Sequence, residues 1–469
     1  MPRSEKIIQL FRENLKKLLH FPEFCGILEI TGIFPKIRKE INMKHQLIAL
    51  LAVMTVSLTG CASLQNKGEN HVINMAEIGI PETTEPPTEP AFYPADVSIA
   101  AVGDNLIHTC VYKTASAHSA DGVVYDFHYC YDGIADRIAK ADLAFINQET
   151  LICNGKLELS GTRVNFNSPV ELGYNLADIG FDVFNMANSD VLDKGAEGLG
   201  YTLDYWDALR KDYPDVTVLG AYRNQEDMQN YRIVEKDGLK IGFLGYTEHT
   251  NERSLPEDSE MIVPYIGDSS LMQMQIQELS PQVDCLIVSM YWGQPDTHTV
   301  DDSIRELAQK MIDWGADVIL GTGSHTLQTM EYLTRADGSK GFVFYSLGNV
   351  ISGQTDNFNM VGGLGEFHVC RDTDGNITIE DVGLTPLITH YDTDMTNVRT
   401  FPYDAYKDRM MNAHYLPHTS GGSYKRWSWE VVDAIVEENV PEEFRRNYTA
   451  NSQNTETESE TDSSTETEE

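Results

Sequence analysis

Residues 285–323 read CLIVSMYWGQPDTHTVDDSIRELAQKMIDWGADVILGTG, and this stretch decides the fold class. It opens with CLIVSMYW, an apolar run of the length and continuity typical of a strand buried on both faces. SIRELAQKMIDWG then repeats apolar side chains at helical spacing, and DVILGTG is a second strand-like run. Strand, helix and strand in this order predict an α/β sheet covered by helices.

The same alternation extends in both directions from this stretch. Further strand-like runs are DVSIAAVG (96–103), LAFINQE (143–149), VFNMAN (183–188), KIGFLGYT (240–247) and FVFYSLGN (342–349). Helical patterns are IADRIAKA (134–141) and LGYTLDYWDALRK (199–211). We therefore predict one large α/β domain.

Composition supports a globular domain and excludes one class of partner. The 469 residues are 41% hydrophobic and 9% aromatic, which is ample for a sizeable core. The formal net charge is −37, whereas a nucleic-acid surface needs clustered Lys and Arg. We expect no nucleic acid among the partners.

The N-terminal region carries a membrane-targeting signal. Residues 43–63 read MKHQLIALLAVMTVSLTGCAS, a basic start, a short apolar stretch and small residues before Cys61. This order is typical of a lipoprotein signal peptide over 43–60, with lipidation at Cys61 and anchoring on the extracytoplasmic face of the cell membrane. A short transmembrane anchor or a buried helix is the alternative. Residues 1–42 are either untranslated, with Met43 as the start, or an extended cytoplasmic segment.

Polar segments flank the predicted domain. Residues 61–94 include PETTEPPTEP and predict an extended spacer, and 447–469 predict a disordered acidic tail. The domain is expected over 95–395, with an extension over 396–446 that packs on it. Trp427 and Trp429 in this extension indicate packing more than an aromatic platform for a sugar.

Several of the predicted strands end in polar residues. The clusters are Gly103-Asp104, Asn147-Gln148-Glu149, Asn188-Ser189-Asp190, Tyr291-Trp292 and Gly321-Thr322-Gly323-Ser324-His325. Catalytic groups in α/β folds collect at the carboxyl ends of strands, so one cluster per strand predicts a convergent site. Turn chemistry or helix capping is the alternative reading of each cluster alone.

At these residues the chain resembles the CapA family, the capsule and poly-γ-glutamate biosynthesis proteins related to calcineurin-like metallophosphatases. The resemblance spans Ala95 to Met395. It runs through VGDNLIH (102–108), ADLAFINQET (141–150), FNSPVELGYNLADIGFD (166–182), VLDKG (191–195), GAYRNQED (220–227), GADVILGTGSH (315–325) and YSLGNVISGQ (345–354). It implies a four-layer α/β sandwich of mixed sheets covered by helices, with a metal-dependent site at the strand ends.

The resemblance also implies roles for individual residues. Asp104, Glu149 and His325 match family metal ligands, with His325 also a catalytic candidate, and His108, Asn147 and Asn349 match family segments and are expected to contact substrate. From their own chemistry, we expect Asp190 to be a further metal ligand or catalytic base and Tyr291 to contact substrate. The chain departs from the family at three places. Ser189-Asp190, Tyr291 and Gly323-Ser324 stand where the family has imidazoles and an amide. The retained ligands suit at most one Mn²⁺, Mg²⁺ or Ca²⁺, and no cofactor is the alternative.

Three functions remain open on this basis. The first is a surface-anchored CapA-family lipoprotein with a degenerate metal site, acting with an anionic envelope polymer or its synthesis machinery. The second is an active metal-dependent hydrolase of amide or phosphoester bonds, and the third is a non-catalytic scaffold. Separation of the four predicted ligands by more than about 8 Å would refute a shared metal site.

Overall fold

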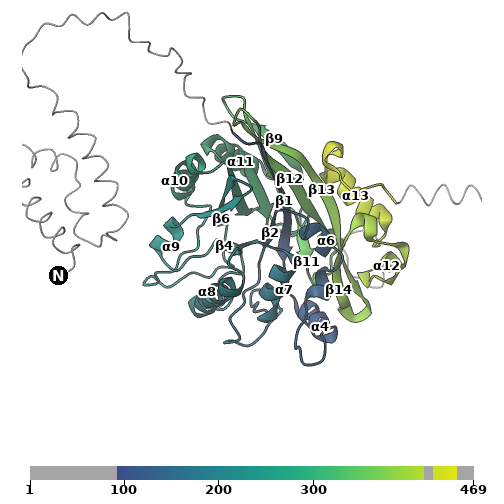
Figure 1. Ribbon diagram of the computed structural model, residues 1–469. Coiled ribbons are helices and arrows are strands. Elements are labelled where there is room, and N and C mark those ends of the chain that lie inside the picture. Colours follow the sequence, from purple (N-terminus) through teal and green to yellow (C-terminus); the bar gives the residue numbers. More distant parts are fainter. Residues whose placement is uncertain (1–91, 417–425, 452–469) are drawn as a thin grey trace, which may run out of the picture. The chain divides into compact units, whose positions relative to one another are not determined.

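The computed structural model describes residues 92–416 and 426–451 (Figure 1). These residues all belong to one compact unit, 88–469, of the two into which the chain divides. The predictions for residues 1–42, the signal peptide, Cys61, the spacer up to residue 91 and the tail beyond residue 451 lie outside the described residues.

The first sheet combines a parallel and an antiparallel half. Its strand order is β14-β13-β12-β1-β2-β3-β4, and β11 also pairs with β1. Strands β1 to β4 run parallel, whereas β12, β13 and β14 are antiparallel to their neighbours. The strands are β1 (Ala95–Asn105), β2 (Leu143–Asn147), β3 (Val183–Asn185), β4 (Thr217–Leu219), β11 (Asn349–Ile351), β12 (Val361–Arg371), β13 (Ile377–Asp392) and β14 (Thr396–Pro402).

The second sheet has the order β5-β6-β7-β8-β10-β9. Its central strands β6, β7, β8 and β10 are parallel, and antiparallel β5 and β9 close the two edges. The strands are β5 (Arg232–Lys236), β6 (Leu239–Thr247), β7 (Cys285–Tyr291), β8 (Val318–Thr322), β9 (Met330–Thr334) and β10 (Lys340–Phe344). Every residue of β7 and β8 is buried, as continuous apolar runs predict for strands covered on both faces.

The longer helices belong to the crossovers between parallel strands. Helix α11 turns Ile304, Ala308 and Met311 inward and stops before Gly315, whose φ of 121° suits glycine at a helix end. The helices are α4 (Thr109–Ala117), α5 (His128–Tyr131), α6 (Ala135–Ile138), α7 (Glu171–Ile179), α8 (Gly195–Asp212), α9 (Gln225–Gln229), α10 (Ser269–Leu279), α11 (Asp302–Trp314), α12 (Asp408–Ala413) and α13 (Trp429–Asn439). In the described part of the chain, no helix has the length and apolar character that crossing a bilayer requires.

The elements stack as helices, sheet, sheet and helices. Between the sheets, the rings of Phe344 on β10 and Phe367 on β12 lie 6.4 Å apart. Trp206 of α8 packs on Phe184 of β3 at 4.8 Å, and α10 and α11 cover the outer face of the second sheet (Figure 1). The predicted four-layer α/β sandwich with mixed sheets is confirmed.

Two details differ from the expected pattern. The strand predicted over 342–349 is wrong as a single element, because its first residues belong to β10 and Asn349 begins β11 in the other sheet. Gly348, with φ of 62°, lies at the point where the chain leaves one sheet for the other. The antiparallel strands β12 to β14 were not among the predicted runs.

The first sheet continues past residue 395, because β14 over Thr396–Pro402 pairs with β13. The following segment packs on the same domain. Trp427 is 3% exposed and Trp429 is 9% exposed, and the Trp429 ring lies 5.3 Å from that of Tyr403.

Candidate metal and substrate site

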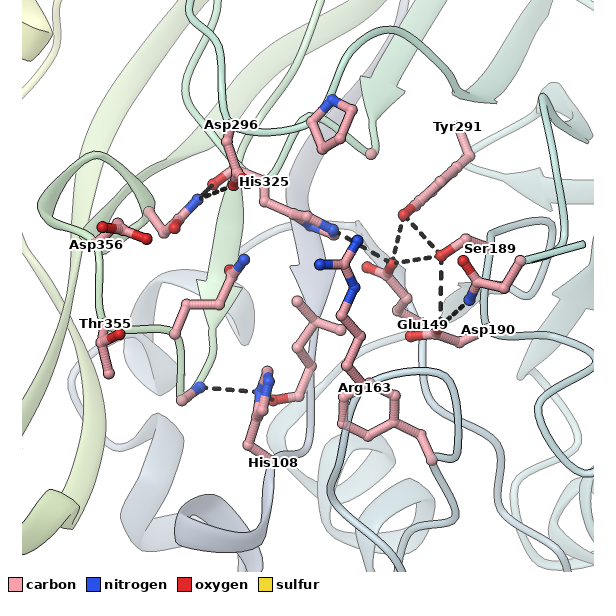
Figure 2. A pocket seen from close by; sticks show the side chains of 18 of the residues that line it. His108, Glu149, Arg163, Ser189, Asp190, Tyr291, Asp296, His325, Thr355 and Asp356 are labelled. Atoms are coloured by element: carbon pink, nitrogen blue, oxygen red, sulfur yellow. Dashed lines mark hydrogen bonds and ion pairs between the residues drawn. The ribbon is translucent and has the colours of Figure 1, made fainter. Parts of the chain in front are cut away.

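The carboxyl ends of β1, β2, β7 and β8 meet along one edge of the two packed sheets. Parallel strands end on the same side, so the polar residues that follow them converge there. Asp104 comes from β1, Glu149 follows β2, Tyr291 ends β7 and His325 follows β8. Figure 2 shows three of these side chains, Glu149, Tyr291 and His325, directed at one another.

Asp104, Glu149 and His325 form a compact group of potential metal ligands. One ligand atom from each lies within 4.8 Å of the other two. His325 Nδ1 is 3.0 Å from Asp104 Oδ2, and its Nε2 is 4.0 Å from Glu149 Oε1. Three of the four predicted ligands therefore converge inside the limit of about 8 Å set above, and Asp190 is not part of this group.

The backbone around two glycines permits this convergence. A Cβ on Gly103 would lie 1.9 Å from the carbonyl oxygen of Gly348, so only glycine allows β1 to pass β11 beside Asp104. Gly323 has φ of 99° and its position faces the Tyr291 ring. His325 itself has φ of 57°, an uncommon conformation for a non-glycine residue that functional sites retain.

A buried amide relay holds Asp104. Asn147 donates from Nδ2 to Asp104 Oδ1 at 2.8 Å, and Asn185 donates to Asn147 Oδ1 at 2.9 Å. The Gly323 amide donates to Asp104 Oδ2 at 3.2 Å. Asn147 is fully buried and does not line the cavity, so its contact in this structure is with the Asp104 carboxylate.

Glu149 is held through one of its two oxygens. Oε1 accepts a hydrogen bond from the Tyr291 hydroxyl at 2.7 Å, and the Ser189 hydroxyl lies 3.5 Å from the same oxygen. Oε2 is buried and has no hydrogen-bond partner in the described residues. An unpaired buried carboxylate oxygen is costly unless a cation or proton satisfies it, and this orphaned atom fits a metal ligand.

The electrostatics of the group also suit a cation. Burial, followed by the charge of Asp104, raises the pKa of Glu149 well above its usual range. Burial opposes protonation of His325, but the charges of Glu149 and Asp104 outweigh it and raise its pKa to about 9. Without a metal, protons on His325 and Glu149 reduce the charge of the group, and a divalent ion would displace them.

Asp190 lies on the same cavity with different partners. Its Oδ1 accepts from Asn251 Nδ2 at 2.6 Å and lies 3.4 Å from Ser189 Oγ. Burial, together with the charge of Asp193, raises the pKa of Asp190 to about 7. The structure thus keeps Asp190 beside the three-residue group but outside its mutual 4.8 Å distance.

His108 and Asn349 lie farther along the site. The Gly353 amide donates to His108 Nδ1 at 3.0 Å, and burial lowers the pKa of His108 to about 4, so the imidazole is neutral. Asn349 donates to Gln354 Oε1 at 2.6 Å, and its Oδ1 is buried without a partner in the described chain. His108 lines the cavity, whereas Asn349 does not.

The cavity over these residues has a volume of about 270 Å³. Its lining includes residues to which the sequence did not point: Arg163, His249, Asn251, Asp296, Gln354, Asp356 and Asn359. His249 follows the strand predicted over 240–247, so the strand-end rule would have found it. The others come from loops whose path the local sequence does not specify.

Known proteins similar to this chain share its family. Residues 98–354, more than half of the chain, match the family described as "Bacterial capsule synthesis protein PGA_cap". The "PGA biosynthesis protein CapA" of Bacillus subtilis (strain 168) is 25% identical over 353 residues, 73% of this chain and 82% of that protein. The "Capsule biosynthesis protein CapA" of Bacillus anthracis is 27% identical over 180 residues, 38% of this chain and 41% of that protein.

The chain also aligns with solved structures, at low sequence identity and low TM-scores. A putative 5'-nucleotidase from Staphylococcus aureus aligns over 62% of this chain and 54% of its own, with a TM-score of 0.39 and 12% identity. The NAD nucleotidase NadN of Haemophilus influenzae aligns over 74% of this chain and 60% of its own, with a TM-score of 0.39 and 13% identity.

Proposed function

Since the chain belongs to the PGA_cap family of bacterial capsule synthesis proteins, we propose that it binds an anionic envelope polymer beside one divalent cation held by Asp104, Glu149 and His325. The observation that carries this proposal is the convergence of these three side chains, together with the buried, unpaired Oε2 of Glu149. Two carboxylates and an imidazole suit Mn²⁺, while Mg²⁺ and Ca²⁺ prefer oxygen ligands alone. Bound there, the cation would supply Lewis-acid attraction for an oxyanion of the polymer.

The proposed site binds one ion and not two. Tyr291 stands where the family resemblance implies an imidazole, and its hydroxyl donates to Glu149. Burial raises the pKa of Tyr291 well above its usual range, so the phenol stays protonated and keeps donating. Ser189 bonds the same phenol at 2.9 Å. The side chains that would have to bind a second ion are hydrogen-bonded to one another instead. This supports a two-metal site that has lost one of its ions.

The shape of the surface around the site supports a polymer as the ligand. A second cavity of about 440 Å³ adjoins the first, and both are lined by His108 and Gly353. Lys113 lines the second cavity. A substrate that follows the two cavities would be elongated, and a neutral His108 lies where it would pass from one to the other.

The proposed place of action is the extracytoplasmic face of the membrane. Support comes from the sequence, because Leu58-Thr59-Gly60-Cys61 follows an apolar segment and precedes a Pro- and Thr-rich stretch. Two acyl chains on Cys61 would anchor the chain stably, since each buried CH₂ contributes roughly 0.8 kcal/mol. The polymer or its synthesis machinery would then be met outside the cell.

A metal-dependent hydrolase is a second candidate, and Asp190 favours it. Asp190 lines the cavity, and a carboxyl with a pKa of about 7 suits a general base near neutral pH. In this version, Asp190 would accept a proton from the water that attacks the amide or phosphoester bond and return it to the leaving amine or alcohol, and His325 would remain a ligand of the cation.

The test uses purified full-length protein, Mn²⁺ and a γ-glutamyl oligomer. We expect one Mn²⁺ per chain and binding of the oligomer, both lost in Asp104→Asn and kept in Asp374→Asn, an exposed control. Binding without cleavage of the oligomer or of a phosphomonoester supports the first candidate. Cleavage that Asp190→Asn abolishes supports the second, and equal Mn²⁺ binding by wild type and Asp104→Asn contradicts both.

A further inference from the structure

We propose that Arg163 binds the anionic group of the substrate, a carboxylate or a phosphate, in the cavity that contains the metal ligands. The inference rests on the proposed function, because it assigns a recognition residue to the same site. Arg163 lies in the loop between β2 and α7 and lines the cavity with Glu149 and His325. Figure 2 shows its guanidinium directed into the cavity.

Arg163 is the one arginine or lysine among the described residues that line this cavity. Besides Tyr291, the other ionisable groups on its wall are four carboxylic acids and three histidines. They are Glu149, Asp190, Asp296, Asp356, His108, His249 and His325. An anionic ligand entering this acidic cavity needs a positive group on the cavity wall, and the exposed side chain of Arg163 supplies one.

The guanidinium makes no hydrogen bond or ion pair with any part of the chain that the structure describes. Two arginines elsewhere in the domain are paired with carboxylates: Arg232 lies 2.6 Å from Asp227, and Arg335 lies 2.8 Å from Asp317. Arg163 stays unpaired although four carboxylic acids line the same cavity. Its five N–H donors are therefore free for a ligand.

The backbone holds Arg163 in this place by a tight turn. The Asn165 amide donates to the Thr162 carbonyl at 3.1 Å, which closes a turn with Arg163 and Val164 at its centre. Val164 has φ of 53°, a strained conformation for a β-branched residue, and is 40% exposed. Burial does not impose this strain, and such strain concentrates at binding sites.

Two side chains from elsewhere in the fold fasten the turn. Arg253 donates from Nη2 to the Val164 carbonyl at 2.9 Å, and Lys194 donates to Asn165 Oδ1 at 2.6 Å. Thr162 lines the adjoining cavity while Arg163 lines the first, so the turn stands where the two cavities meet. A guanidinium at that junction would grip an elongated anion partway along its length.

The chemistry of the guanidinium fits carboxylate and phosphate equally. Its planar fork forms two parallel hydrogen bonds to either oxyanion, which an ammonium group cannot reproduce. With a cation on Asp104, Glu149 and His325, an oxyanion would meet positive charge from two sources, the cation and the Arg163 guanidinium.

The test is calorimetric titration of full-length protein in saturating Mn²⁺ with two probes, tri-γ-glutamate and inorganic phosphate. We expect Arg163→Gln to lower the affinity for the probe that binds by about 10- to 100-fold, and Arg163→Lys to lower it by less. Lys156→Gln is the matched control, because it removes one positive charge from an exposed position of the same loop and leaves affinity unchanged. The probe that responds shows whether a carboxylate or a phosphate is recognised.

Equal affinity of wild type and Arg163→Gln for both probes would overturn the inference, and so would absence of binding of either probe to wild type. A separate Mn²⁺ titration distinguishes this failure from that of the proposed function. Loss of anion binding in Arg163→Gln together with no Mn²⁺ binding in wild type would refute the metal site and retain the role of Arg163.

Discussion

Replacing Asp190 by Asn should stabilise the protein at neutral and higher pH. Asp190 is 4% exposed, and burial together with Asp193 raises its pKa from 3.8 to about 7 in the folded protein. The folded state therefore holds the Asp190 proton more tightly than the unfolded state does. The resulting stability is fully present below pH 3.8 and is lost as pH rises through about 7.

The size of the effect follows from the shift. A difference of about 3 units at 1.36 kcal/mol per unit gives an upper bound of roughly 4 kcal/mol above pH 7. Asn keeps the oxygen that accepts from Asn251, but its amide hydrogens need new partners, so we expect a gain of about 2 kcal/mol at pH 8. At pH 4 the two proteins should be nearly equal.

Urea unfolding of metal-free protein at pH 4 and pH 8 measures this difference, with Asp374→Asn as the exposed control. If Asp190→Asn is more stable than wild type at pH 8 but not at pH 4, the ionisable group at this cavity lowers the stability of the fold, as functional groups often do. Equal stability of wild type and Asp190→Asn at pH 8, or a less stable variant, would refute the reasoning.

Three further predictions concern the site, the turn and the anchor. Mn²⁺ affinity should rise with pH up to about 9, because the cation must displace the proton of His325. Calorimetric titrations in buffers of different ionisation enthalpy should detect the released proton. An affinity that does not change with pH would contradict this prediction. Val164→Gly should raise the free energy of unfolding by up to about 1 kcal/mol, since relief of strain at φ of 53° exceeds the entropic cost of glycine, and a lower urea midpoint would be the opposite result. Cys61→Ser should move the protein from the membrane fraction to the soluble one, and unchanged fractionation would rule out lipid anchoring.

The parallel core was predictable because its sequence signals are local. β7 and β8 are continuous apolar runs, and α11 carries its buried side chains at helical spacing. The antiparallel strands were harder to predict. β12 contains Gly362, Gly363 and Gly365, which weaken strand propensity, and its close packing against β13 becomes visible only in the folded chain.

The site divides along the same line. Asp104, Glu149 and His325 follow strands whose ends could be read from the sequence, and strand polarity then brings them together. Arg163 could not be found this way, because a mid-loop turn places it, and that turn depends on distant partners such as Arg253. The separation of Asp190 from the three-residue group likewise depends on Asn251, which the sequence did not link to it.

The central claim is that Asp104, Glu149 and His325 hold one divalent cation. Anomalous X-ray diffraction from crystals of the protein grown with Mn²⁺ tests it most directly. The account predicts one strong anomalous peak, with an oxygen of each carboxylate and a nitrogen of His325 at about 2.0 to 2.3 Å from it. No peak among these side chains, or a second ion bound beside the first, would contradict it.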